Sequence, residues 1–160
     1  FALVTVIDVA FAPFTELESV NPVGDATALA DLFASIPMRL LYGGITEEIL
    51  LRWGVMAPIA FVLWRVRHRL GVRKEEPPAA VLWVAILASA VVFGVGHLPA
   101  LASTFDLTPA LVVRTVLLNT IVGVALGWLF WRRSLETAMV AHAAFHVVLV
   151  GVSVVAMLLF

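Results

Sequence analysis

Long apolar runs separated by short polar segments dominate the chain and predict membrane-spanning helices. Three such runs cover residues 79–98, residues 109–131, and a stretch that begins near residue 134 and continues toward the C-terminus. Each offers the ~20 apolar residues that a helix needs to cross the hydrocarbon core. An earlier run, residues 31–65, is longer than a straight span requires. We therefore expect it to be tilted, partly outside the membrane, or broken at its prolines and glycines.

The N-terminal part differs from the rest of the chain. Residues 1–14 are apolar but short and contain Asp8, so we expect a partial span or an interfacial segment. An acidic linker follows over residues 15–31. Because the chain begins with Phe1 and ends in an apolar run, we interpret the sequence as a fragment of a longer protein.

Composition strengthens the membrane interpretation. Hydrophobic residues make up 62% of the 160 residues, charged residues only 13%, and the mean hydropathy is +1.08. We expect an all-α, polytopic transmembrane bundle with about four spans, forming one membrane domain over residues 1–160. The absence of cysteine excludes disulfides, thiolate metal ligands and a cysteine nucleophile. A net charge of −1 argues against nucleic acid as a partner.

The charged loops predict an orientation. The basic segments 65–74 and 132–133 fall on the same side of the membrane if the four runs are consecutive spans. The positive-inside rule then places both segments, which we expect to be loops, in the cytoplasm. We expect His68 to be solvated within the first of them.

Two adjacent carboxylates and an arginine lie inside the first apolar run. Glu48 and Arg52 are four residues apart, so they share a helix face in a favourable order for an ion pair. A structural and a functional role are both open for that pair. Glu47 points about 100° away and needs a partner from another helix, and an ionisable residue at this depth is a candidate functional residue.

Three histidines lie in later apolar runs. His97 is near the end of the second, where it could be either an interfacial anchor or a functional group. His142 and His146 are four residues apart on the last run, which places them on one helix face. Such a pair can bind a divalent metal or donate hydrogen bonds to a substrate or to neighbouring helices. If Glu47 and His97 joined them, the four would form a His3Glu metal set.

Two further polar residues lie in the third run. We expect Asn119 to form a hydrogen bond to another helix, and Arg114 to extend to the membrane interface. Counting residues along straight helices places His142 and His146 ~9–15 Å from the depth of Glu47 and His97. A common site therefore requires tilted or offset helices.

The motifs together resemble a known family. The patterns Glu47-Glu48-x-x-x-Arg52 and Phe93-x-x-x-His97, and a third that begins at His142, follow one another on successive apolar runs. This order is similar to that of the CAAX-protease and bacteriocin-processing (CPBP, or Abi) intramembrane proteases, which include the eukaryotic CAAX prenyl endopeptidase. The resemblance covers about residues 31–150.

The resemblance implies an intramembrane endopeptidase. Glu47 would activate a water molecule with help from His97, and His142 would bind the tetrahedral oxyanion. Glu48 and Arg52 would form a supporting ion pair. No cofactor is certain; a divalent metal such as zinc remains open, because both glutamic and metallo-type mechanisms have been considered for the family.

His146 departs from the family pattern, which has asparagine or aspartate at this position. An imidazole N–H can still stabilise an oxyanion, so His146 is a fourth candidate catalytic residue. It could instead favour metal binding by Glu47, His97 and His142 together with His146. It could also mark an inactive member of the family.

Two alternatives to a protease stay open. One is an inactive accessory subunit of a larger membrane complex, and the other is a component of a proton-relay or ion-relay transporter. The expected partners are the lipid bilayer and a peptide or membrane-protein substrate. We expect the membrane to be that of a prokaryotic cell.

Overall fold

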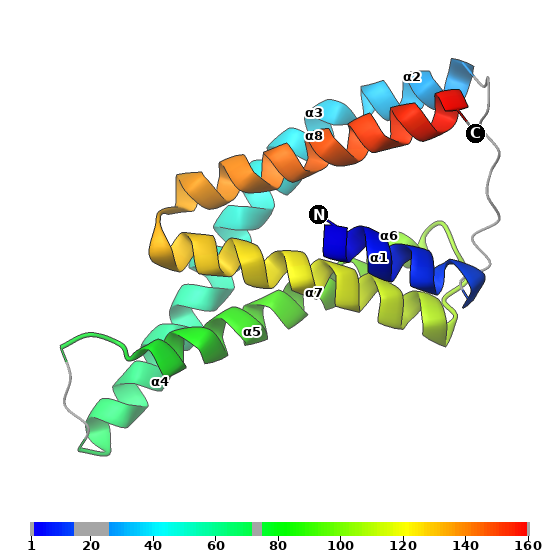
Figure 1. Ribbon diagram of the computed structural model, residues 1–160. Coiled ribbons are helices and arrows are strands. Elements are labelled where there is room, and N and C mark those ends of the chain that lie inside the picture. Colours follow the sequence, from blue (N-terminus) through cyan, green and yellow to red (C-terminus); the bar gives the residue numbers. More distant parts are fainter. Residues whose placement is uncertain (1, 15–25, 72–74, 160) are drawn as a thin grey trace.

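The computed structural model describes residues 2–14, 26–71 and 75–159, and this part of the chain is helical, without strands. Four helices are long and apolar enough to cross a membrane, which confirms the predicted all-α bundle. Figure 1 shows their arrangement. In chain order the elements are α1 (Ala2–Phe11), η1 (Ala12–Phe14), α2 (Ala26–Ala34), α3 (Ile36–Met38), η2 (Arg39–Glu47), η3 (Ile49–Met56), α4 (Ala57–Arg69), α5 (Ala79–Gly96), α6 (Leu98–Ala102), α7 (Pro109–Arg132) and α8 (Leu135–Leu159).

The first span is one long helix of 43 residues, from Thr27 to Arg69. It continues through the prolines and glycines at which we expected breaks. Its central part is π-helical in η2 and η3, and the Thr46 hydroxyl bonds the carbonyl of Leu41, five residues earlier, at 3.2 Å. Figure 1 shows that the helix changes direction here, so that its first part runs beside α8 and its last part beside α5. π-Helical turns are frequent at functional sites.

Several boundaries differ from the prediction. Residues 26–31, expected in the acidic linker, belong to α2, and residues 15–25 of that linker lie outside the described residues. Residues 65–69 of the basic segment belong to α4 rather than to a loop, because the backbone hydrogen bonds of the long helix continue to its last turn. His68 lies on this turn with its ring edge-on to Trp64. The second span also does not end at Pro99. After a turn at His97 the chain forms the short helix α6, and proline is tolerated there because it occupies the first turn.

Helices α5 and α7 form the closest pair in the bundle. A Cβ atom on Gly94 would lie 2.6 Å from the carbonyl oxygen of Val116, and one on Gly123 would lie 3.1 Å from Ala90. The two glycines therefore permit this approach, as small residues commonly do in membranes. The Thr120 hydroxyl adds a bond from α7 to the Ala90 carbonyl, at 3.3 Å.

Two polar residues of α7 have partners that were not predicted. The Arg114 guanidinium pairs with Asp8 of α1, which packs along α7, and its extension to the membrane interface stays a prediction. Asn119 does not bond another helix through its amide nitrogen; it donates to the Thr115 carbonyl of its own helix at 2.8 Å. A carbonyl four residues earlier is a ready local acceptor, and it satisfies the amide without a partner helix.

The molecule has a small apolar core and a large apolar exterior. Met56, Ala60, Val81, Ala85 and Ile86 form a buried cluster between the first span and α5. Many large hydrophobic side chains on all four spans face outward. Because helices satisfy their own backbone hydrogen bonds, such an exterior is suited to lipid. The protein is an integral membrane protein.

Candidate active site

A buried ion network lies where the first span meets α8. The Arg52 Nε donates to Glu48 Oε2 at 2.8 Å, and Nη2 donates to Oε1 at 3.3 Å. His142 Nδ1 lies 3.0 Å from the same Oε1, across 94 residues of sequence. The Glu48 and Arg52 side chains are fully buried, and the His142 side chain is 3% exposed. Glu48 is therefore engaged on both oxygens, and this arrangement links α8 to the first span.

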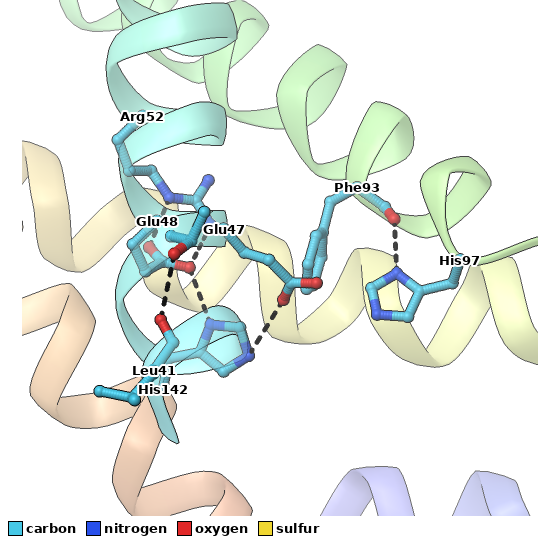
Figure 2. A network of polar contacts seen from close by, with 8 residues as sticks. Leu41, Glu47, Glu48, Arg52, Phe93, His97 and His142 are labelled. Atoms are coloured by element: carbon cyan, nitrogen blue, oxygen red, sulfur yellow. Dashed lines mark hydrogen bonds and ion pairs between the residues drawn. The ribbon is translucent and has the colours of Figure 1, made fainter. Parts of the chain in front are cut away.

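The contact with Glu48 places a hydrogen on one nitrogen of His142. A carboxylate can only accept, so His142 Nδ1 donates to Glu48 and its Nε2 points the other way. Figure 2 shows Nε2 directed toward Glu47, and the Glu47 Oε2 lies 4.0 Å from it. His142 thus contacts both carboxylates, one through each ring nitrogen.

Glu47 has a different environment from Glu48. Its side chain is 17% exposed, and among the described residues the His142 ring is the one basic group within 4.0 Å of its carboxylate. In Figure 2 its carboxylate extends away from Glu48 toward α5. A cleft of about 260 Å³ lies there, between the first span and α5, and its lining includes Tyr42, Glu47, Leu50, Val92, Phe93 and His97. Glu47 is therefore the carboxylate that a bound molecule can reach.

His97 lines the same cleft with a defined tautomer. Its Nδ1 is 2.8 Å from the carbonyl oxygen of Phe93, and a carbonyl can only accept, so Nδ1 carries a hydrogen. In a neutral ring Nε2 then has the free lone pair. The Phe93 ring packs edge-on against His97 and also against His142, with centroid distances of 4.7 and 5.8 Å. Phe93 thus separates the two imidazoles and sets their spacing.

His146 lies outside this cleft. Its ring stacks on His142 at 4.9 Å with 18° between the planes, and it faces a separate pocket beside Arg39 and Leu40. Both ring nitrogens are buried, and neither has a hydrogen-bond partner among the described residues. Gly43 makes room for the ring, because a Cβ atom there would collide with His146 Nε2. The structure therefore places His146 behind His142 rather than beside Glu47.

The four candidate metal ligands do not form a metal set. Within the described residues, no group of three or more His, Cys, Asp or Glu side chains is arranged to bind a metal ion. His97 Nδ1 bonds a backbone carbonyl and His142 Nδ1 bonds Glu48, which leaves the Nε2 atom of each ring without a bond of this kind. His146 faces another pocket. The predicted set of three histidines and Glu47 is therefore not assembled among the described residues, and the chemistry below is derived from the side chains alone.

Two contributions to the site were not predicted from the sequence. The η2 segment approaches α8 closely because Gly43 and Gly44 face it; a Cβ atom on Gly44 would lie 3.0 Å from the Ala143 side chain. We had interpreted these glycines only as possible breaks. The second contribution is the π-helical geometry of η2 and η3, for which the sequence gives no periodic signal. The available clue to this close approach was that η2 carries two small residues and α8 several alanines, which allow two helices to pack closely.

The fold and the site define a polytopic membrane protein with carboxylates and imidazoles gathered in its apolar interior, the setting for hydrolysis within a membrane. Residues 29–148 match the family of Rce1-like type II CAAX prenyl endopeptidases, and the chain belongs to this family. The resemblance based on the three motifs is thereby confirmed. Membership points to a CAAX-type intramembrane protease. Comparisons with curated proteins and with solved structures gave no match.

Proposed function

We propose that the protein is an intramembrane endopeptidase in which Glu47 is the general base. One observation supports this most directly. Of two adjacent carboxylates, Glu48 is fully buried and paired, whereas Glu47 reaches an open cleft that it shares with His97. A base must contact both water and substrate, and only Glu47 is placed to do so.

The attack on the peptide bond would begin in the cleft. The Glu47 carboxylate removes one proton from a water molecule, and the lone pair of His97 Nε2 accepts a hydrogen bond from the other. The water oxygen is then oriented toward the peptide carbonyl carbon. As the new C–O bond forms, the π electrons of the carbonyl move to its oxygen and create the oxyanion.

His142 would stabilise that oxyanion. When both its nitrogens are protonated, Nδ1–H remains bonded to Glu48 and Nε2–H can donate to the negative oxygen. With His142 in this form, two anions and two cations balance within the group Glu47, Glu48, Arg52 and His142. Collapse of the intermediate breaks the C–N bond, and the proton held by Glu47 passes to the leaving amine.

The open cleft also bears on the alternative of an inactive accessory subunit. That alternative predicts an obstructed cavity at Glu47, whereas about 260 Å³ is available beside it. Tyr42, Leu50 and Val92 line the cleft and are 45–51% exposed on the lipid-facing exterior. A peptide or membrane-protein segment could thus enter from the bilayer.

The test is Glu47→Gln, which preserves size and removes the base. Cleavage of a membrane-anchored peptide in proteoliposomes should fall by about 10²–10⁴-fold in kcat, the usual contribution of general base catalysis. Glu76→Gln, in an exposed position after α4, is the matched control and should cleave normally. Wild-type cleavage rates in a well-folded Glu47→Gln protein would refute the mechanism.

A further inference from the structure

A second cavity lies far along the first span from Glu47. It is a groove of about 400 Å³ between α4, the start of α5 and the end of α7. Its walls are aromatic and aliphatic, and include Phe61, Trp64, Leu82, Phe130 and Trp131. No residue that lines it also lines the cleft at Glu47. Ala57, in the groove, is ten residues beyond Glu47, or roughly 15 Å at the rise of a helix.

The groove ends beside positive charge. The guanidinium of Arg132 lies 5.3 Å from the centroid of Trp131, over the ring that forms one wall. Arg132 is exposed, and no carboxylate of the described residues forms an ion pair with it. Other exposed arginines follow the groove residues of α4 or adjoin Arg132, namely Arg65, Arg67, Arg69 and Arg133. An apolar cavity thus opens next to a group of exposed arginines.

We propose that this groove binds an anionic phospholipid, with one acyl chain between the aromatic walls and the headgroup phosphate at Arg132. Tryptophans and arginines at the end of membrane spans lie at the level of lipid headgroups. Basic clusters next to a span recruit anionic lipids. Arginine is also well suited to a phosphate because its planar donors can bond two oxygens.

The bilayer is the most direct source of such a ligand. The groove faces the exterior that is in contact with lipid, so a phospholipid reaches it without leaving the membrane. The preference for anionic over zwitterionic lipid should come largely from Arg132. This is the arginine whose guanidinium contacts a groove wall. The acyl chain contributes apolar contact that both lipids share.

The experiment is native mass spectrometry of the delipidated protein, titrated with phosphatidylglycerol or phosphatidylcholine of identical chains. One phosphatidylglycerol should bind with a Kd about fivefold or more below that of phosphatidylcholine. Arg132→Gln should remove this difference. Ala57→Phe, which fills the groove, should weaken both lipids. Trp131→Leu, which removes the ring beneath Arg132, is a second variant for the case in which Ala57→Phe misfolds, and it should reduce the preference.

Arg69→Gln is the matched control, because Arg69 is exposed on α4 and does not line the groove. This variant should keep most of the preference for phosphatidylglycerol. Equal binding of both lipids by the wild type would overturn the proposal. So would unchanged phosphatidylglycerol binding by Ala57→Phe together with Trp131→Leu. Displacement of the lipid by a lipid-modified peptide substrate would assign the groove to substrate instead.

Discussion

Glu47 and Glu48 are neighbours on one helix and both lie beside His142, yet they differ in burial and in their other contacts. Glu48 has no exposed surface, and it bonds Arg52 and His142. Glu47 is partly exposed, lies 4.0 Å from His142 and borders a cleft. A step of one residue along the helix thus separates a carboxylate that belongs to a buried ion network from one that borders the cleft. His142 lies between them and couples the two environments through its two nitrogens.

Substitutions in the buried Glu48–Arg52 pair should have the larger effect on stability. Arg52→Met removes the cation and leaves the Glu48 carboxylate buried with only His142 beside it. Breaking a buried ion pair from one side typically costs 3–5 kcal/mol, so the free energy of unfolding should fall by about that amount. Reversible unfolding in mixed micelles measures it, and a loss below ~1 kcal/mol would show that Glu48 does not depend on Arg52.

The contact between η2 and α8 should show a smaller effect. Gly43→Ala places a Cβ atom where His146 Nε2 lies, so the ring must shift and the stacked His142 with it. We expect a loss of ~1–3 kcal/mol in unfolding free energy, typical of an overpacked interior, with reduced cleavage.

Gly54→Ala is the matched control on the same long helix, because a Cβ atom there meets nothing within 4 Å. Alanine is favoured over glycine in a helix, so this variant should be as stable as the wild type or slightly more stable. Equal losses in the two variants would mean that the loss at Gly43 does not come from the space that this glycine leaves for His146.

The smallest expected effect concerns His146. If its ring acts by stacking on His142, His146→Phe should keep most of the activity, while His146→Ala should lose about 2- to 10-fold, the worth of an aromatic contact. Single-turnover cleavage measures both. A Phe variant as inactive as Glu47→Gln would instead give the His146 nitrogens a direct chemical role.

Residue spacing predicted the local geometry well. The four spans followed from the apolar runs, and the Glu48–Arg52 pair matches the spacing of four residues on a helix. The same spacing correctly placed His142 and His146 side by side. It could not show that His142 faces the carboxylates while His146 turns to another pocket, because that choice depends on which neighbouring helix each ring meets.

The long-range geometry could not be predicted in the same way. Straight helices put His142 at a different depth from Glu47, and the two meet because the first span changes direction through its π-helical centre. The predicted interhelical hydrogen bond of Asn119 was wrong, because its amide nitrogen donates to a carbonyl of its own helix. Sequence patterns report neighbours on one helix, whereas contacts between helices depend on small residues such as Gly43 that have no strong pattern.

The most direct test of the central claim compares Glu47→Gln with Glu48→Gln in two measurements on the same preparations. We expect Glu47→Gln to unfold like the wild type and to lose about 10²–10⁴-fold in kcat. The main effect of Glu48→Gln should be a loss of stability, because its uncharged amide weakens the bonds to Arg52 and His142. The opposite result, a stable and inactive Glu48→Gln beside an active Glu47→Gln, would contradict the division of roles between the two carboxylates.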